Sequence, residues 1–192
     1  MPRILQSMSL VLAALLVAAG AARADTIATT QITPSTTMGQ YAYFSLDQIN
    51  DGIVSDAYPY NGYASGFGVV SGRITLILDQ AYDLSSFVLW NDVNVLNEGV
   101  RSFKLVFEDA SGGVLGSTGT YTAVSQFAPQ TYSFASVVSG VKTVHLDVLT
   151  SILQIEIREL AFNGTVTAVP EPATWALGLL GAAAFAGWRR RY

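Results

Sequence analysis

The sequence predicts an all-β domain, an antiparallel β-sandwich of the jelly-roll type, enclosed between two short membrane-directed ends. Three observations support this prediction. Apolar and polar residues alternate in several short segments, which is the pattern of half-buried strands. Glycine-containing turn sequences separate these segments, and no helical periodicity is sustained outside the two ends of the chain. Several short strands at this spacing are typical of sandwiches and jelly rolls.

The first 24 residues have the three parts of a secretory signal peptide. Arg3 supplies a positive charge, Met8–Ala19 is an apolar run, and Ala22-Arg23-Ala24 is a small-residue cleavage site. We therefore expect cleavage between Ala24 and Asp25, followed by export of the mature chain. An N-terminal anchor that is not cleaved is the alternative, and the cleavage site disfavours it.

The middle of the chain divides into a lead-in segment, residues 25–44, and the sandwich domain, residues 45–168. The lead-in is rich in Thr and Ser, and we expect Thr26–Gly39 to be loosely structured. Phe87–Trp90 is apolar on both faces, which predicts a central strand. Three further segments alternate with period two: Arg73–Asp79, Ser102–Glu108 and Thr143–Val148. Turn sequences lie around these strands at Asp51-Gly52, Ser71-Gly72, Ser111-Gly112-Gly113, Ser139-Gly140 and Asn163-Gly164.

The C-terminal segment, residues 169–192, combines a rigid polar motif, an apolar run and a basic stop. The motif is Pro170-Glu171-Pro172, the sixteen residues Ala173–Trp188 carry no charge, and Arg189, Arg190 and Arg191 follow. Sixteen helical residues span roughly 24 Å, which is short of the roughly 30 Å hydrocarbon core. This predicts a short transmembrane helix whose arginines stay on the cytoplasmic side.

This order of parts resembles the PEP-CTERM sorting tag of Gram-negative bacteria over Val169–Tyr192. The resemblance implies an exosortase-type processing enzyme as partner, which cuts near Pro170-Glu171-Pro172. It also implies a transient inner-membrane intermediate, followed by transfer to the cell surface or the extracellular matrix. A plain C-terminal membrane anchor is the alternative interpretation.

Composition excludes several classes of function. Residues 25–168 contain five Lys or Arg and thirteen Asp or Glu, so the domain is acidic and disfavours nucleic acid and anionic lipid as partners. The chain has no cysteine, so neither disulfides nor thiolate metal sites form. The single histidine, His145, lies beside Asp147 on one strand face, without a Gly-x-Ser-x-Gly elbow or another catalytic motif. We expect no enzymatic activity, and no catalytic residues.

A second resemblance covers roughly Ser45–Val166. Asn50-Asp51-Gly52, the strand Arg73–Asp79 and the closing Ile155–Leu160 are similar to the galactose-binding-like jelly roll, shared by discoidin-type domains and many carbohydrate-binding modules. The chain departs from that pattern because it lacks a cysteine pair joining the domain ends. It also has no tryptophan after the Asp-Gly loop.

The second resemblance implies a structural calcium ion that joins the Asp-Gly loop to the final strand. The ligands it implies are Asp51, carbonyls of residues 50–56, and Glu159, with Asp56 as a weaker alternative. Leu153, Ile155 and Ile157 share one face, whereas Leu160 and Phe162 continue in the opposite phase, which predicts a β-bulge near Arg158 and Glu159. The alternative is that Asp51-Gly52 is only a turn and that Glu159 meets water or a basic group.

A sugar site requires aromatic faces and polar groups on loops at one end of the sandwich. Tyr58, Tyr60 and Tyr63 crowd one loop and are the candidate ligand contacts, although such tyrosines also cap the core of small β domains. Trp90 is expected in the core. The sequence thus favours an exported, exosortase-processed envelope or matrix protein that binds extracellular polysaccharide. The alternative is a structural or adhesive matrix protein with protein–protein contacts and no sugar site.

Overall fold

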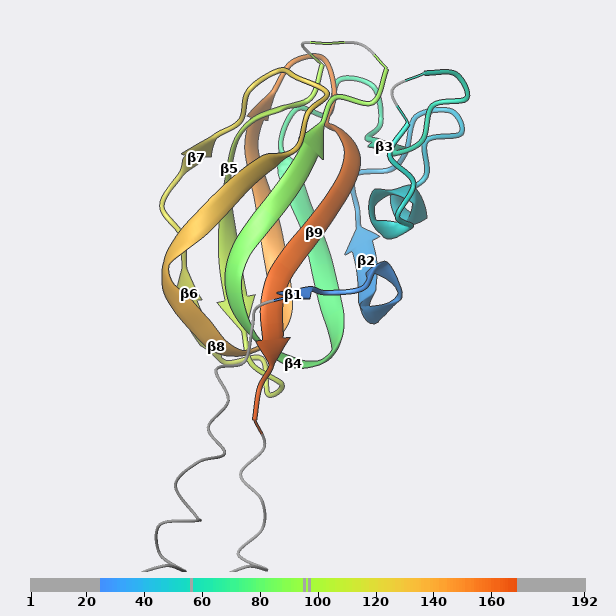
Figure 1. Ribbon diagram of the computed structural model, residues 1–192. Helices are drawn as coiled ribbons and strands as arrows, with labels where there is room; N and C mark the ends of the chain where they lie inside the picture. The colour runs from blue at the N-terminus through green and yellow to red at the C-terminus, as the bar shows by residue number, and fades with distance from the viewer. Residues whose placement is uncertain (1–24, 56, 95, 97, 169–192) are drawn as a thin grey trace, which may run out of the picture.

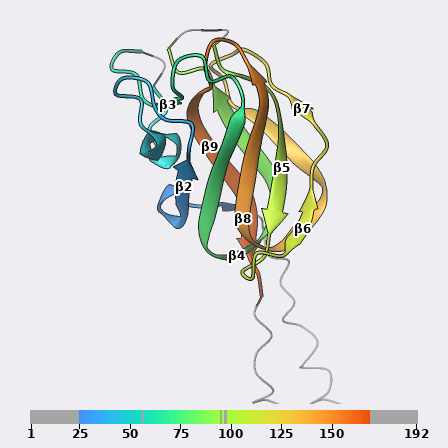
Figure 2. The same cartoon turned by 180° about the vertical axis from the view of Figure 1, so that it is seen from behind.

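The computed structural model of the protein describes residues 25–168, apart from 56, 95 and 97. The predicted signal peptide and the sorting segment after residue 168 lie outside the described residues. Nine antiparallel strands and two short 3-10 helices, η1 and η2, make up the described part (Figure 1, Figure 2). In chain order these are β1 Asp25–Thr26, η1 Thr29–Gln31, β2 Ile32–Thr36, η2 Leu46–Asn50, β3 Tyr63–Ala64, β4 Gly72–Asn91, β5 Val100–Glu108, β6 Val114–Ser117, β7 Tyr121–Thr122, β8 Gln130–Ser151 and β9 Glu156–Val166. No described helix is long and apolar enough to cross a membrane.

Two long strands, β4 and β8, run through both layers of the sandwich. The first half of β4 pairs with β2 and with the second half of β8, which in turn pairs with β5. The second half of β4 pairs with β9 on one side and with the first half of β8 on the other. The strand order β1-β9-β4-β8-β5-β6 therefore folds over on itself, and the two apolar faces meet in one core (Figure 1).

The alternating segments point their apolar residues into this core, as predicted. Phe103, Leu105 and Phe107 on β5 are buried, and so are the matching apolar positions of β4 and β8. Phe103 packs against three other aromatic residues of the core. Its ring centre lies 4.9–5.5 Å from those of Phe87, Tyr121 and Tyr132. The segment Phe87–Trp90 is a central strand, flanked by β9 and β8. Apolar burial of this kind is the main favourable contribution to folding.

Three expectations about local structure are wrong. The Thr- and Ser-rich lead-in is not loose, because Ile32–Thr36 forms β2 against β4 and Ile27 is buried in the core. Ser139-Gly140 does not form the expected turn between strands but lies inside β8. There Gly140 has φ +77°, which lets the strand bend from one layer into the other. The Asn163-Gly164 pair is likewise inside β9, paired with β1 and β4.

Gly62 fixes the loop of residues 51–62 against β9. Its φ is +142°, and a Cβ at this position would lie 2.7 Å from the carbonyl oxygen of Ile157 and 2.8 Å from the Cα of Arg158. We expect Gly62→Ala to lower the free energy of unfolding by about 1–3 kcal/mol, measured by urea denaturation. Gly68→Ala is the control, since its φ is +83° but nothing lies within 4 Å of its Cβ position. Equal losses in both variants would contradict the role of close approach at Gly62.

Candidate functional site

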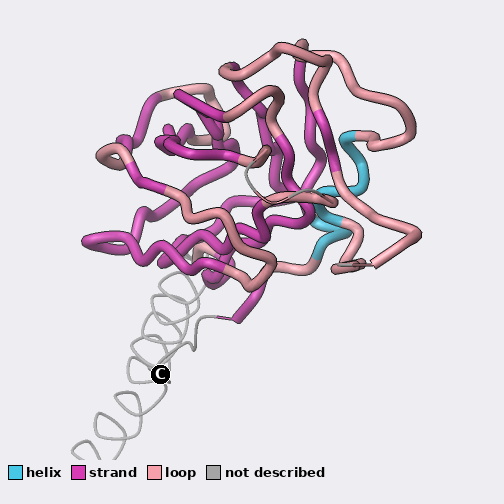
Figure 3. The backbone as a smooth tube through the Cα atoms, turned by 90° about the horizontal axis from the view of Figure 1, so that it is seen from above, coloured by secondary structure: helices cyan, strands magenta, loops and turns pink. Residues whose placement is uncertain are grey.

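Several loops gather at one end of the sandwich, which we call the loop end. They are the connections β2–η2–β3, β4–β5, β7–β8 and β8–β9, and they lie opposite the end at which β9 stops (Figure 1). Seen from above, loops lie over the ends of the strands, and the two short helices lie at one side of the sandwich (Figure 3). Residues far apart in the sequence therefore meet at the loop end, where binding sites of β-sandwich folds have room to form.

A β-bulge in β9 places two charged residues inside the protein. Trp90 pairs with Glu159 and Asn91 pairs with Ile157, so Arg158 is the extra residue on β9. This confirms the bulge predicted near Arg158 and Glu159. Both side chains are buried, because the bulge changes the face toward which β9 points them.

Arg158 joins three segments of the loop end. Its Nε and Nη2 donate to the carbonyl oxygen of Asp92 at 3.1 and 2.8 Å, and Nη2 also donates to that of Asn91 at 3.3 Å. Its Nη1 donates to the carbonyl of Phe127 at 3.2 Å, and the guanidinium carbon lies 4.5 Å from the centre of the Phe127 ring. The buried cation thereby holds the β4–β5 and β7–β8 loops to β9.

Glu159 is a buried carboxylate with no hydrogen-bond partner among the described residues. Only 3% of the residue is exposed, and neither Oε1 nor Oε2 accepts a hydrogen bond. Burial raises the pKa of the Glu159 carboxyl to about 8, and repulsion from Asp51 adds to the rise. The backbone amides of Gly52 and Asp51 oppose it, although they do not reach hydrogen-bonding geometry. A buried carboxylate without a partner is costly, so the folded protein favours its neutralisation, either by a proton or by a bound cation.

Beside Glu159, four oxygen atoms surround one nitrogen atom. The Nδ2 of Asn61 lies 3.0 and 3.1 Å from the two carboxylate oxygens of Asp51, 3.0 Å from the carbonyl oxygen of Ile53 and 3.4 Å from that of Gln48. An amide group has two hydrogens, so it cannot donate a full hydrogen bond to all four. Carboxylate and carbonyl oxygens gathered in this way are the ligands that calcium prefers.

The residues present at this position fit the structural calcium ion implied by the fold. Asp51 and Glu159 would supply carboxylate oxygens, and Gln48 and Ile53 would supply carbonyl oxygens; the Glu159 oxygens accept no hydrogen bond among the described residues. Asp56, the alternative ligand, lies outside the described residues. Within the described ranges no group of three or more His, Cys, Asp or Glu side chains could hold a metal ion. A calcium ion here would therefore depend on backbone carbonyl ligands.

A second feature of the loop end is a pocket of about 160 Å³. It is lined by three aromatic and four polar residues: Tyr41, Phe44, Phe67, Asn94, Glu98, Gln154 and Glu156. The rings of Tyr41 and Phe67 lie 6.5 Å apart and both are exposed. Gln154 is 95% buried, yet its Oε1 has no hydrogen-bond partner among the described residues. The pocket thus combines ring faces with an unpaired acceptor.

Glu156 forms the acidic side of this pocket. Its Oε2 accepts a hydrogen bond from the backbone N–H of Val93 at 3.0 Å, and its Oε1 accepts one from Nε2 of Gln154 at 2.9 Å. Burial raises the pKa of the Glu156 carboxyl, and these two hydrogen bonds partly oppose the rise. The position and orientation of the carboxyl group are therefore fixed by its neighbours.

The structure separates the three tyrosines proposed as ligand contacts. Tyr58 is 82% exposed and stands edge-on to Tyr60, with ring centres 6.4 Å apart, while Tyr60 packs against Phe44 beneath the pocket. Tyr63 is fully buried, and its hydroxyl donates to the carbonyl of Gly39 at 2.6 Å. Its assignment as a ligand contact is therefore corrected, because β3 turns this ring into the core.

None of the residues that line the pocket was predicted from the sequence as a ligand contact. The large aromatic residues that are exposed in the described part all fall between residues 41 and 67, at Tyr41, Tyr43, Tyr58 and Phe67. This clustering of aromatic residues in the sequence could have indicated the aromatic side of the pocket. The polar side could not be predicted in this way, because its residues come from two other parts of the chain. His145 is elsewhere, on β8, where its ring nitrogens lie 3.0 Å from Glu108 Oε1 and 3.0 Å from Thr75 Oγ1.

The solved structures most useful for comparison are carbohydrate-binding modules and a related domain. The family 32 module of Clostridium perfringens NanJ, solved in complex with galactose, superposes with a TM-score of 0.63 at 13% identity, over 73% of this chain and 98% of that chain. The F5/8 type C domain of a Bacteroides fragilis protein gives 0.59 at 14% identity, over 75% and 98%. A Streptococcus pneumoniae fucose binding module gives 0.55 at 12% identity, over 72% and 96%.

At the level of sequence, the PEP-CTERM protein-sorting motif matches residues 168–191. This confirms the assignment made from Pro170-Glu171-Pro172, the apolar run and the terminal arginines. No curated protein matches the chain. The PEP-CTERM motif implies export, exosortase processing and sorting to the cell surface. The chain therefore joins a C-terminal PEP-CTERM protein-sorting motif to a domain with the β-sandwich fold of family 32 carbohydrate-binding modules and F5/8 type C domains.

Proposed function

We propose that this protein is a carbohydrate-binding module displayed outside the cell, which binds extracellular polysaccharide at the loop-end pocket. The observation that carries the proposal is the pocket itself, which sets two exposed aromatic rings beside an unpaired buried acceptor. Sugars present apolar ring faces together with hydroxyl donors, so this combination matches them. The fold of the similar modules supports the same class of ligand.

The chemistry of the pocket favours a neutral sugar. Tyr41 and Phe67 offer ring faces for stacking, and Oε1 of Gln154 would accept a hydrogen bond from a hydroxyl group. Glu98 and Glu156 would repel a uronic or sialic acid carboxylate. The similar modules are described with galactose and fucose, both neutral sugars.

The arrangement of the chain ends supports display with the pocket directed away from the membrane. β9 stops at the end opposite the loop end (Figure 2). Beyond it, Thr167 is still attached to the domain, since its N–H donates to the carbonyl of Ala81 at 3.0 Å and its hydroxyl to Asp83 at 2.7 Å. Only two residues separate Thr167 from Pro170. The processing motif therefore follows closely on the domain, and the pocket stays accessible.

Retention on the producer's own polysaccharide tests this proposal. We expect Tyr41→Ala and Phe67→Ala each to weaken retention about tenfold, corresponding to roughly 1.4 kcal/mol for a lost stacking contact. Tyr43→Ala is the matched control, because Tyr43 is exposed at the same end but does not line the pocket. If Tyr58→Ala alone abolishes retention, the loop of Tyr58 and Tyr60 is the site instead of the pocket. Failure of the unaltered protein to bind any polysaccharide would overturn the function.

A further inference from the structure

One long stretch of the domain contains only uncharged residues. Residues 110–141, here called the charge-free flank, contain no Asp, Glu, Lys, Arg or His, although the rest of residues 25–168 holds eighteen Asp, Glu, Lys or Arg residues. The flank comprises β6, β7 and the first half of β8, which lie together on one side of the sandwich (Figure 1). A charge-free surface of this length is unusual in a domain whose net charge is −8.

The charge-free flank is poorly covered by the rest of the protein. Of residues 111–140, all of which the structure describes, Ala123 alone is buried. Val114, Val124 and Val137 are each more than half exposed, and Leu115 is 42% exposed. Leu115 and Val137 line one groove, and exposed apolar side chains that lie together mark an interaction site.

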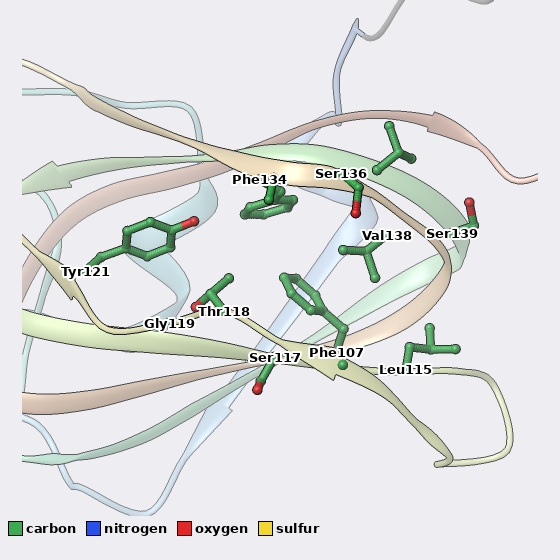
Figure 4. A pocket seen from close by; sticks show the side chains of 13 residues that line it. Phe107, Leu115, Ser117, Thr118, Gly119, Tyr121, Phe134, Ser136, Val138 and Ser139 are labelled. Carbon is green, nitrogen blue, oxygen red and sulfur yellow. The ribbon is translucent and has the colours of Figure 1, made fainter.

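A groove of about 440 Å³ runs along the flank between the two walls formed by residues 115–119 and 134–139 (Figure 4). The rings of Phe107 and Phe134 both line it, with their centres 5.2 Å apart. Ser117, Thr118 and Ser136 stand on its walls, and no charged residue lines it. The groove therefore suits an uncharged occupant with apolar side chains.

Both walls of the groove are open strand edges. β6 pairs with β5 alone. In the first half of β8, residues 130–133 and Val138 pair with β4 alone, whereas residues 134–137 bulge out of register and have no strand partner among the described strands. Natural edge strands are protected by proline, charge or shortness. Of the other edge strands in the described part, β2 contains Pro34, while β1, β3 and β7 have two residues each. The flank edges have neither proline nor charge. Each contains a register shift, but the outer side of each has no strand partner among the described strands and is therefore open to pairing.

We infer that the charge-free flank is a self-association surface on which a second copy of this chain pairs edge to edge. Two copies of a domain with net charge −8 repel each other wherever their charged surfaces meet, but not across this flank. Pairing identical strands here brings no like charges opposite one another. A glycan would need an open ring face, whereas of the three rings that line the groove Phe107 is buried and Tyr121 and Phe134 are half-buried. The inference is independent of the loop-end pocket.

Light scattering coupled to size-exclusion chromatography of the full chain in mild detergent tests whether the protein self-associates. The unaltered chain is expected to elute at a multiple of its monomer mass. Val137→Lys and Leu115→Lys, one on each wall, should each return it to the monomer. Ile77→Lys is the matched control, because Ile77 is similarly exposed on β4 outside the flank and its variant should keep the larger mass. Thermal melts identify any variant that fails to fold.

A second measurement does not depend on disrupting the interface. The chain has no cysteine, so single cysteines placed in turn at positions 133 to 138 can be tested for disulfide-linked dimers. At least one position should cross-link, and Ile77→Cys should not. A monomeric chain, a larger mass that survives both lysine variants, or no cross-link at any of the six positions would each overturn the inference. Retention of a neutral glycan by a monomer, lost in Val137→Lys, would overturn it in favour of a glycan groove.

Discussion

Millimolar calcium is expected to raise the melting temperature of this protein by about 5–10 °C relative to EGTA, and Glu159→Gln is expected to abolish that rise. A ligand that binds only the folded state stabilises it by about 2.7 kcal/mol at a hundredfold excess over its dissociation constant. The physical reason is the buried carboxylate of Glu159, which has no hydrogen-bond partner among the described residues and is repelled by the carboxylate of Asp51. A calcium ion bound between them would neutralise both carboxylates.

The same carboxylate predicts how stability depends on pH without calcium. Its pKa is raised from about 4.5 to about 8 in the folded protein, so the folded state holds a proton that the unfolded state has already released. The stabilisation is complete below pH 4.5 and is lost as pH rises through 8, at a cost of roughly 3–5 kcal/mol at most. Glu159→Gln should therefore be more stable than the unaltered protein in EGTA at pH 8.

Thermal melts across pH 5–9, with EGTA and with calcium, check both expectations. Asp51→Asn should also lose the calcium response, whereas Asp79→Asn, a change at an exposed carboxylate in the middle of β4, should keep it. An unchanged melt with calcium, together with a Glu159→Gln variant that is less stable at pH 8, would contradict the calcium site. It would also leave the burial of this glutamate without a compensating partner.

Arg158→Leu is expected to lower the free energy of unfolding by about 3–5 kcal/mol, because carbonyl groups buried around Arg158 lose their charged hydrogen-bond donor. Leucine cannot replace the hydrogen bonds to the carbonyl groups of Asn91, Asp92 and Phe127, which would remain buried without donors. The loop end should loosen as a consequence, since this side chain joins two of its loops to β9.

Urea denaturation measures this loss, and protection of the loop end can be followed by hydrogen exchange. Arg73→Leu is the control. Arg73 binds Asp147 at 2.6 Å, but half of its side chain is exposed, so its removal should cost about 1 kcal/mol or less. Similar losses for the two arginine variants would show that Arg158 contributes no more than a surface ion pair.

The local features of this protein followed from its sequence because each depends on neighbouring residues. The sorting motif is a contiguous order of proline, apolar and basic residues, and it is confirmed at residues 168–191. The inward faces of β5 and the bulge at Arg158 were also predictable, since strand alternation and its phase are properties of a short segment. The expected turn at Ser139-Gly140 was wrong, because a glycine that bends a strand and a glycine that ends one look alike in a sequence.

Tertiary structure alone decided which of these residues act together. Glu159 lies more than one hundred residues from Asp51 in the sequence, so their proximity and the absence of a partner for Glu159 depend on how β9 packs beside the loop. The burial of Tyr63 likewise reflects the direction in which β3 turns. The uncharged stretch 110–141 is present in the sequence, but only strand pairing shows that its edges remain open across a groove. The sequence by itself determined the strands and the sorting signal, whereas burial and long-range contacts, which are properties of the packed domain, determined the sites.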